Sequence, residues 1–373
     1  MKPVLPGGTI GIMGGGQLGS MLCVEARRMG YKTVVLDPAA DAPAAAVCDV
    51  FIQAAVDDKE SALKLAAQSD VVTLEWELIP AETLKAIESK KPLFPSSKVI
   101  EAIQDRLTQK EFLQSRGLPL APFAAVDTQT SLAAGVRRLG PDCILKRRRA
   151  GYDGKGQQVI TADTDLSVAE NLLSAPCVLE RKVSFKKELS VILSRDGNGT
   201  VTFFPLAENI HRKGILHATV APARISSEVR KKAEDLAAAA ASALGHVGVL
   251  AAELFLLPGG ALLINEIAPR VHNSGHYTLG ACATSQFEAH LRAVCGLPAG
   301  APALLAPAVM VNLMGELWES GEPDWTKVLA CPQARLHLYG KKKASPGRKM
   351  GHIVLVGVDA EAGLALADEL LRQ

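Results

Sequence analysis

The sequence lacks three features that would assign a protein class at once: a cysteine framework, an excess of one charge, and a long apolar run. Its seven cysteines are scattered, odd in number and never spaced Cys-x-x-Cys, so they predict neither disulfides nor a zinc site. Lys plus Arg number 41 and Asp plus Glu 39, and this formal charge of +2 gives no reason to expect nucleic acid as a partner. Partners must therefore be inferred from sites.

No membrane span or secretory leader is expected. Residues 236–252 carry no Asp, Glu, Lys or Arg, but Gly245 and Gly248 divide this stretch into an alanine-rich helix and a strand. The first residues lead directly into a strand, without the layout of a signal peptide. We expect a cytoplasmic protein, and 373 residues are enough for two or three domains.

Two apolar runs of strand-like composition, Val249 to Leu257 and the run that begins at Ala261, flank Pro258-Gly259-Gly260. A Gly-Gly pair between such runs is typical of a β-hairpin. If these two glycines form a two-residue turn, Glu253 lies directly opposite Glu266. Like charges in such a pair destabilise a sheet.

The neighbouring pairs predicted on this face are apolar, Phe255 with Ile264 and Leu257 with Leu262, so the carboxylates are poorly solvated. A cation between them removes the repulsion. Two oxygen ligands without a nearby Cys or His favour Mg²⁺, which completes its shell with water and phosphate oxygens. Two alternatives need no metal: the strands of the hairpin are paired in a shifted register, or the face that carries the carboxylates is exposed to solvent. Pro269 ends the second strand, and the donor-rich loop from Arg270 to His276 is where we expect the substrate.

The N-terminal part indicates a parallel α/β sheet. A strand at residues 9–13 leads into Gly14, Gly16 and Gly19, which fit G-x-G-x-x-G, and Asp37 ends the next strand. Taken literally, this pattern predicts NAD. A glycine turn at a helix N-terminus also suits any phosphate, or no ligand at all.

Further strands at residues 71–75 and 93–95 and a helix at 81–88 extend this alternation over about the first hundred residues. Glu75 and Glu77 lie where such a sheet binds ligands, although on this pattern alone a solvated loop is the preferred explanation.

Two cationic glycine loops follow. A strand from Cys143 delivers Lys146, and four cations surround the glycine-rich residues 151–157, a pattern that favours a polyphosphate over a solvated hairpin. Residues 339–352 hold five cations in a Gly/Pro loop, usually a solvated hairpin, with a substrate phosphate as the alternative. Antiparallel strands with a long helix at 226–244 make the middle of the chain an α+β unit, and a Pro/Ala/Gly-rich linker at 298–307 precedes three strands and a closing helix.

Five segments, 105–110, 151–156, 265–276, 285–288 and 346–352, together resemble the ATP-grasp superfamily and, within it, the N5-carboxyaminoimidazole ribonucleotide synthetases of purine biosynthesis. The resemblance runs from Gly14 to His352. It implies an α/β and α+β fold: a Rossmann-like pre-ATP-grasp domain (1–100), an ATP-grasp domain (101–300) with a lid at about 120–180, and a small β-rich C-terminal domain (301–373).

The resemblance also implies an activity. The substrates would be ATP, bicarbonate and 5-aminoimidazole ribonucleotide, and the products the N5-carboxy compound, ADP and phosphate, formed through carboxyphosphate. Mg²⁺, with Mn²⁺ as a substitute, would be held by Glu253 and Glu266. A homodimer is the family expectation. The general base, the number of metal ions and the lid conformation are left open.

The site residues that the resemblance implies fall into three groups. ATP would be held by Arg106, Lys146, Gly151, Tyr152, Asp153, Gly154, Lys155, Gly156, Gln157, Glu180, Arg181, Lys182, Val183, Glu188, His211, Asn265 and Glu266. The ribonucleotide would contact Gly16, Gln17, Leu18, Glu77, Tyr152, Asp153, Lys155, Arg270, His272, Asn273, Ser274, Lys341 and Arg348. Catalysis would involve Asp153, Lys155, His272 and Lys341.

Some positions depart from the family pattern: Ser20, Trp76, Leu78, Ala150 and Ser345 replace a usual Arg, Phe, Asn, Gly and Arg. The two lost arginines bear on phosphate binding or on an interface contact. On a regular strand Asn265 points away from Glu266, so its implied role requires a local twist.

Three rival functions remain. A formate-dependent glycinamide ribonucleotide transformylase uses the same fold, but its loop typically reads Arg-Pro-His-Asp-Thr, unlike residues 272–276 here. A nicotinamide-dependent oxidoreductase would use the glycine turn and leave the lysine-rich loop and the carboxylate pair unexplained. A catalytically inactive ATP-binding regulator is disfavoured by the intact Glu253, Glu266 and Lys146.

Overall fold

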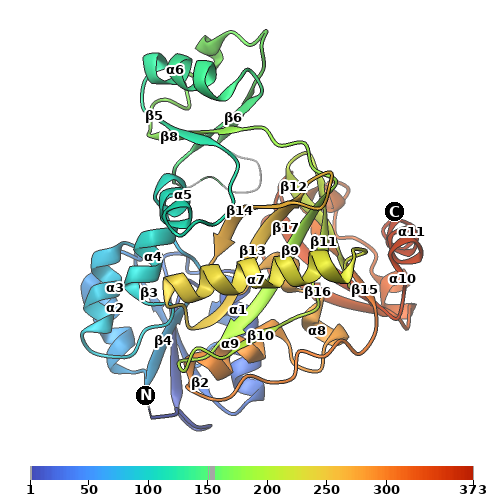
Figure 1. Cartoon of the computed structure of the whole chain (residues 1–373). Helices are drawn as coiled ribbons and strands as arrows, with labels where there is room; N and C mark the ends of the chain where they lie inside the picture. The colour runs from blue at the N-terminus through green and yellow to red at the C-terminus, as the bar shows by residue number, and fades with distance from the viewer. Residues whose placement is uncertain (1, 150, 152–155, 373) are drawn as a thin grey trace.

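The N-terminal sheet has four parallel strands in the order β3-β2-β1-β4, in a computed structural model that describes residues 2–149, 151 and 156–372 (Figure 1). The predicted parallel α/β arrangement is confirmed. The predicted strand at 93–95 is wrong, because Leu93 makes only an isolated bridge to Val72. The elements are β1 (Thr9–Met13), α1 (Gln17–Arg28), β2 (Lys32–Asp37), η1 (Pro43–Ala46), β3 (Val50–Gln53), α2 (Lys59–Ala67), β4 (Val71–Leu74), α3 (Ala81–Glu88) and α4 (Ser97–Ile103).

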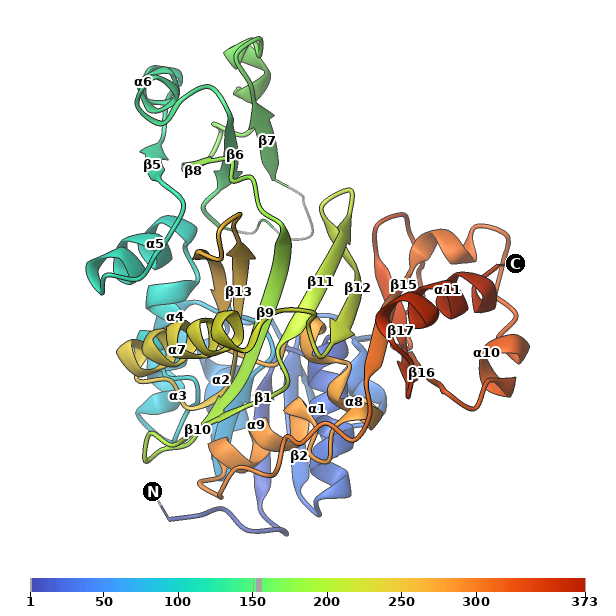
Figure 2. The ribbon, with the colours of Figure 1, turned by 45° about the vertical axis from the view of Figure 1, so that its right-hand side comes forward.

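A second sheet of four antiparallel strands, ordered β5-β8-β6-β7, stands apart at the top of both overall views (Figures 1 and 2). It has a small core of its own, in which Leu132 of α6 packs with Leu145 and Leu179. Its strands lie between Phe123 and Arg181, the segment predicted to form the lid, and this segment is called the lid below. The elements are α5 (Arg106–Ser115), β5 (Phe123–Val126), α6 (Gln129–Leu139), β6 (Cys143–Arg147), β7 (Gln157–Ile160), η2 (Leu166–Ala169) and β8 (Cys177–Arg181).

The third sheet has nine strands in the order β14-β13-β9-β11-β12-β15-β17-β16, with β10 paired to β9. Because β12 pairs with β15, the C-terminal strands continue the central sheet (Figure 2). The strands are β9 (Lys187–Arg195), β10 (Val201–Phe203), β11 (Ala207–Arg212), β12 (Ile215–Ala221), β13 (Gly248–Leu256), β14 (Leu262–Ala268), β15 (Ala308–Met314), β16 (Ala334–Leu338) and β17 (Lys349–Val356). The helices are α7 (Ser227–Leu244), η3 (Asn273–Gly275), α8 (Thr278–Ala281), α9 (Gln286–Val294), η4 (Gly315–Trp318), α10 (Thr326–Ala330) and α11 (Ala360–Leu370).

The long helix α7 forms as its sequence predicts. The Ser226 side chain accepts from the Val229 N–H at its start, and Gly245 ends it with φ +62°, a left-handed conformation that glycine adopts without strain. Its small alanines at 233, 237, 240 and 241 are buried against β9 and β13. Alanine allows helix and sheet to approach closely, so α7 covers one face of the central sheet (Figure 1).

Helices α1 and α9 join the N-terminal sheet to the central sheet. Leu18 and Leu22 of α1 belong to the same buried core as Phe287 and Leu291 of α9. The Thr73 hydroxyl of β4 also lies 2.7 Å from His290 Nε2. These contacts fix the end of β4 relative to the β13–β14 hairpin, and the candidate site depends on that relation. No helix in the described part of the chain is long and apolar enough to cross a membrane.

Candidate functional site

A cavity of about 1000 Å³ lies where the ends of the N-terminal strands, the β13–β14 hairpin, the lid and the C-terminal loop meet. This volume is at the upper end of the range for small-molecule sites. The cavity brings together residues from all parts of the chain that were predicted separately. Those that line it are Gln17, Leu18, Glu77, Arg106, Lys146, Gly151, Gly156, Gln157, Glu188, His211, Glu253, Asn265, Glu266, Arg270, His272, Asn273, Lys341 and Arg348.

Other predicted residues do not line this cavity. They are Gly16, Glu180, Arg181, Lys182, Val183 and Ser274. Arg181 directs its Nε to the Leu139 carbonyl at 2.7 Å, and the Lys182 N–H donates to the Asp142 carbonyl at 2.9 Å. Tyr152, Asp153, Gly154 and Lys155 lie outside the described residues, as does Ala150.

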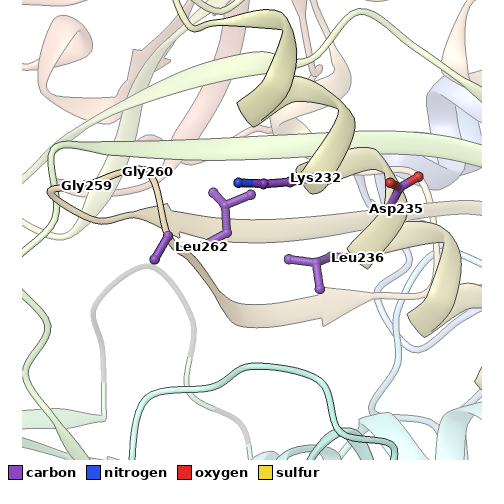
Figure 3. Close-up of a pocket in the computed structure, with 7 residues that line it drawn as sticks. Lys232, Asp235, Leu236, Gly259, Gly260 and Leu262 are labelled. Carbon is purple, nitrogen blue, oxygen red and sulfur yellow. The ribbon is translucent and has the colours of Figure 1, made fainter.

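A second hollow, of about 550 Å³, lies between α7 and the hairpin turn (Figure 3). Leu236 and Leu262 supply its apolar wall, and Lys232 and Asp235 are its charged residues. Asp235 is already paired with Lys231 at 3.0 Å. None of the predicted site residues lines this hollow, so the larger cavity is the candidate site.

The hairpin register places Glu253 opposite Glu266, as predicted. The predicted turn is wrong, however, because the Leu257 N–H donates to the Ala261 carbonyl and the turn contains three residues. The neighbouring pairs are therefore Leu254 with Ile264 and Leu256 with Leu262, not the predicted ones. A bulge in the register between Glu253 and Leu254 then restores the carboxylate pair.

The same bulge accounts for Asn265, which falls between the paired residues Ile264 and Glu266. A bulge places two residues of one strand against one of its partner, so successive side chains no longer alternate strictly between faces. Asn265 and Glu266 accordingly both line the cavity. The bulge is a local irregularity of the kind that the implied role of Asn265 requires.

The two carboxylates differ in electrostatic state. Burial and the neighbouring Glu266 raise the pKa of Glu253. Burial also acts to raise the pKa of Glu266, but Arg106, whose Nη1 donates to Glu266 Oε2 at 2.6 Å, outweighs it and lowers that pKa. The second nitrogen of Arg106 donates to the Gly151 carbonyl at 2.7 Å. Arg106 thus connects the carboxylate pair to the start of the glycine-rich loop.

Glu180 lies beneath the cavity, where it anchors two lysines. Its Oε2 is 3.1 Å from both Lys146 Nζ and Lys110 Nζ, and its side chain is only 6% exposed. Burial raises the pKa of Glu180, but the two lysines lower it below its usual value. Lys110 was not predicted as a site residue, although it belongs to segment 105–110, one of the five that carry the family resemblance. Lys146 is thereby held where it lines the cavity.

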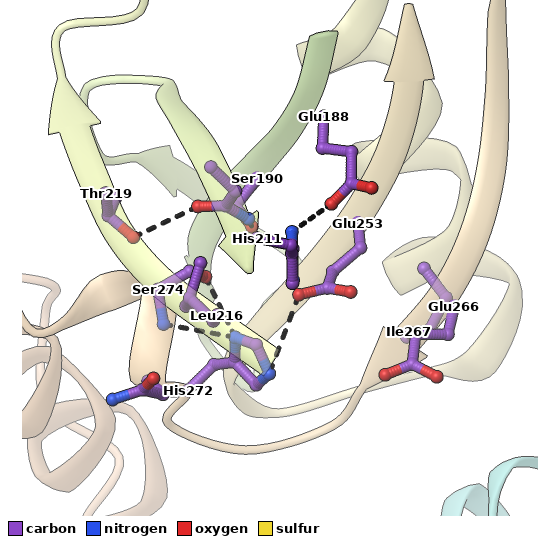
Figure 4. A network of polar contacts seen from close by, with 12 residues as sticks. Glu188, Ser190, His211, Leu216, Thr219, Glu253, Glu266, Ile267, His272 and Ser274 are labelled. Atoms are coloured by element: carbon purple, nitrogen blue, oxygen red, sulfur yellow. Dashed lines mark hydrogen bonds and ion pairs between the residues drawn. The ribbon is translucent and has the colours of Figure 1, made fainter. Parts of the chain in front are cut away.

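On the other side of Glu253, Glu188 and the His211 Nδ1 form an ion pair (Figure 4). Burial acts to lower the pKa of His211, but Glu188 outweighs it and raises the pKa above its ordinary value. A stacked pair of rings, Phe185 and Phe255, lies in the same wall with centroids 4.7 Å apart. Nothing in the sequence pattern indicated that pair, because the two residues are far apart in the chain.

The loop after β14 is held by Glu77 of the N-terminal part. Arg270 donates from Nε to Glu77 Oε2 at 2.6 Å and from Nη2 to Oε1 at 2.9 Å. This bidentate pair, between residues predicted to share a substrate, joins two sheets across the cavity.

The surroundings of His272 favour its neutral form. The Ser274 N–H donates to His272 Nδ1 at 3.3 Å, so the ring proton belongs on Nε2, which lies 3.8 Å from Glu253 Oε1 (Figure 4). Burial, helped by Arg270, lowers the pKa of His272 to about 3. Ser274 is fully buried and acts here through His272.

The C-terminal segment supplies cations and an amide. Lys341 Nζ donates to the Lys349 carbonyl at 2.7 Å, and Arg348 Nη1 donates to the Lys343 carbonyl. Asn312 of β15 exchanges two hydrogen bonds, of 2.7 and 3.0 Å, with the Asn273 amide.

Ser345, one of the departures, lines the cavity beside these groups, as do Trp76 and Leu78 on the opposite wall. Ser20, the other position where an arginine is usual, lies on α1 and does not line it.

The glycine turn of the N-terminal sheet is filled by the protein itself. Glu75 accepts from the N–H groups of Gly16 and Gly19 at 2.7 and 2.8 Å, and Asp37 accepts from Gly15 at 2.7 Å. A pyrophosphate needs these donors, so the arrangement argues against NAD.

The carboxylate pair fits a hard cation. In the described part of the chain no group of three or more His, Cys, Asp or Glu side chains is arranged to hold a metal ion. A pair of carboxylates on paired strands, open to a cavity of polyphosphate size, is the donor set that Mg²⁺ takes when substrate oxygens and water complete its shell.

The sequence matches three domain families in succession. They are the ribonucleotide synthetase preATP-grasp domain over residues 8–104, the ATP-grasp domain over 111–287, and the phosphoribosylaminoimidazole carboxylase C-terminal domain over 308–365.

Whole proteins match as well. The N5-carboxyaminoimidazole ribonucleotide synthase of Bacillus subtilis (strain 168) is 47% identical over 354 residues, which are 95% of this chain and 92% of the relative. The Staphylococcus aureus N5-carboxyaminoimidazole synthetase complexed with ADP is 39% identical with a TM-score of 0.93, covering 100% of this chain and 99% of that one. The Aspergillus clavatus synthase in complex with ADP and 5-aminoimidazole ribonucleotide is 33% identical with a TM-score of 0.89, covering 98% and 97%.

Proposed function

The chain belongs to the N5-carboxyaminoimidazole ribonucleotide synthase family, and from this premise we infer that it catalyses the ATP-dependent carboxylation of 5-aminoimidazole ribonucleotide in purine biosynthesis. One observation carries the inference. A single cavity has the carboxylate pair Glu253 and Glu266 with Lys146 in one part of its wall, and Arg270, His272 and Asn273 in another. A site with both sets suits a nucleoside triphosphate and a second, phosphorylated substrate.

Bicarbonate is the proposed carbon source. Its oxygen attacks the γ-phosphorus of ATP, the bond to the β-phosphate oxygen breaks, and ADP leaves with that electron pair. Carboxyphosphate then delivers CO₂ to the substrate amine and releases phosphate, while the amine loses a proton. Lys146, held by Glu180, offsets negative charge that builds on the phosphoryl oxygens.

Glu253 and Glu266 are the proposed holders of Mg²⁺, or of Mn²⁺ in its place. When bound, the ion supplies positive charge to the polyphosphate. Glu266 now accepts from Arg106, so this guanidinium is poised to turn towards the phosphates when the carboxylate gains another cation.

The remaining nucleotide contacts are proposed along the segment that leads from the lid to the central sheet, residues 180–183, and at the Glu188–His211 pair. The buried Glu180 Oε1 has no hydrogen-bond partner in the structure, and it lies in this segment. The predicted contributions of residues 151–157 to ATP binding belong to the same proposal.

The ribonucleotide is proposed to lie between Arg270, Asn273 and the C-terminal cations. Lys341 and Arg348 are suited to its phosphate. Neutral His272 offers Nε2–H to an anionic intermediate. Asp153 and Lys155 remain predicted contributors to catalysis, and the lid is proposed to exclude water from carboxyphosphate.

Three further proposals concern organisation. Domain boundaries near residues 100 and 300 are proposed, with support from the ends of the matched families, although the central sheet runs through the second boundary. Homodimerisation and a cytoplasmic location are proposed from the family resemblance.

The decisive assay measures ADP release from Mg-ATP with bicarbonate and aminoimidazole ribonucleotide supplied together, and then with each omitted. We expect turnover to require the ribonucleotide, with the N5-carboxy product trapped as it forms. Turnover with formate and glycinamide ribonucleotide instead would keep the fold and overturn the substrate assignment.

A further inference from the structure

Two buried glutamines bind the main chain near the loop that follows β14. One contacts Ile267, before the loop, and the other contacts His272, within it. Gln109 of α5 is 6% exposed, and Gln286, the first residue of α9, is fully buried. Neither was predicted as a site residue. Gln109 is 158 residues from Ile267 in the sequence, whereas Gln286 is 14 residues from His272.

Each glutamine holds both main-chain groups of one residue. Gln109 Oε1 accepts from the Ile267 N–H at 3.0 Å, and its Nε2 donates to the Ile267 carbonyl at 3.2 Å. Gln286 Oε1 accepts from the His272 N–H at 2.9 Å, and its Nε2 donates to the His272 carbonyl at 2.8 Å. The second N–H of each amide is also used, by the Ile103 carbonyl at 3.2 Å and by His276 Nδ1 at 3.0 Å.

The position of Ile267 explains why Gln109 is needed. Strand β14 is at the edge of the central sheet, so its outward N–H and C=O groups have no neighbouring strand. Buried main-chain groups without partners are costly. Gln109 supplies the missing partners next to Glu266, at the point where the strand passes from the carboxylate pair to the loop.

Gln286 does the same for a segment that is not a strand. His272 and Asn273 follow Arg270 in a turn, and the Gln286 amide replaces the hydrogen bonds that a sheet would give. The fit is close, because a Cβ on Gly275 would lie 2.4 Å from Gln286 Oε1. The side chains of His272 and Asn273 are therefore fixed from behind the cavity wall.

We propose that Gln109 and Gln286 are separate positioning residues for the two substrates: Gln109 sets the nucleotide and metal side through Glu266, and Gln286 sets the ribonucleotide side through His272 and Asn273. This assignment of sides rests on the proposed function. Gln109 also lines the cavity, whereas Gln286 does not. Both amides are neutral, buried and fully hydrogen-bonded, so the residues that each amide holds are the basis for assigning the two roles.

The test uses Gln109→Glu and Gln286→Glu, each of nearly unchanged shape. A carboxylate still accepts from the N–H but cannot donate to the carbonyl, which is left unpaired. Binding of Mg-ADP and of aminoimidazole ribonucleotide is measured separately by calorimetry, and the KM of each substrate by ADP release. Gln129→Glu, on the exposed start of α6, is the matched control.

Gln286→Glu is expected to weaken ribonucleotide binding about 10-fold or more and to leave ADP binding within about 2-fold. Gln109→Glu is expected to weaken ADP binding about 10-fold or more and to leave ribonucleotide binding within about 2-fold. A buried carboxyl that gains a proton regains a donor, so the weakened affinity of each variant should recover in part as the pH is lowered from about 8 to about 6. Gln286→Met and Gln109→Met should show the same split without this recovery, and they serve if a Glu variant does not fold.

Equal losses for both ligands in each variant, or no loss in either, would overturn the proposal and show that the glutamines only support the fold. Failure of the proposed function is a different result, because wild-type protein would then show no ribonucleotide binding and no ribonucleotide-dependent ADP release.

Discussion

The two parts of the cavity differ in how their polar groups are satisfied. The part proposed for ATP is a set of opposed charges: Glu266 with Arg106, and Glu180 with Lys110 and Lys146. The loop at the part proposed for the aminoimidazole ribonucleotide is held largely by neutral groups: Gln286 binds the main chain of His272, and Asn312 binds the side-chain amide of Asn273. In the first part, the ion pairs must rearrange when charged ligands bind. In the second part, the hydrogen bonds already orient the loop.

The bidentate pair of Arg270 and Glu77 is the exception in the second part. Here opposed charges join the loop after β14 to the N-terminal part of the chain. The comparison therefore predicts that charge-removing variants act most strongly at the nucleotide part, and that geometry-changing variants act at the ribonucleotide part.

The largest effect is expected for Glu266→Gln. Loss of this charge removes a proposed metal ligand and the partner of Arg106, so turnover should fall by about 10³-fold or more while the fold is retained. ADP release and circular dichroism measure the two properties. Glu60→Gln, on the exposed face of α2, is the control. Wild-type turnover in the variant, with excess Mg²⁺ excluded as the rescuer, would defeat the metal assignment.

Arg270→Lys should come next. Lysine keeps the charge but cannot make the two parallel hydrogen bonds to Glu77, so the loop loses its alignment. We expect kcat/KM for the ribonucleotide to fall about 10²-fold, with the KM for ATP within about 2-fold. An equal rise in both KM values would show that the Arg270–Glu77 pair positions groups for both substrates, which would contradict the proposed difference between the two parts.

Lys341→Ala should have a smaller effect, confined to the ribonucleotide. Removing one cation near a phosphate is expected to raise the KM for the ribonucleotide about 10-fold and to leave ATP binding nearly unchanged. Steady-state kinetics with each substrate varied in turn gives both values. Equal effects on the two substrates would move the C-terminal loop away from the ribonucleotide.

The smallest effect concerns acid stability. Burial holds the pKa of His276 well below 6.5, so the unfolded chain binds a proton at this residue that the folded protein does not. Its contribution is present above pH 6.5 and is lost as the pH falls below that value. Between pH 6.5 and 5, His276→Gln should therefore lose about 2–4 °C less in melting temperature than wild type. A variant that follows the wild-type pH dependence would show that His276 is not responsible.

Local pattern predicted much of the fold. Strand β1 and helices α3 and α7 lie where the local sequence pattern predicts them, since each is determined by neighbours in the sequence. Strand β3 and helices α2 and α4 were not predicted. The pairing of Glu253 with Glu266 was predicted correctly, but from a two-residue turn that is wrong. The turn has one residue more, and the bulge between Glu253 and Leu254 offsets that difference.

The sequence by itself determined the chemical groups: two carboxylates on a hairpin, two cationic glycine loops and a donor-rich loop, together with the family resemblance that their order carries. Only the tertiary structure decided how these groups are satisfied. Glu75 filling the glycine turn, Lys110 beneath Lys146, and the amides of Gln109, Gln286 and Asn312 join residues from different elements. Such contacts depend on burial and on the pairing of distant strands, and residue spacing along the chain does not encode them.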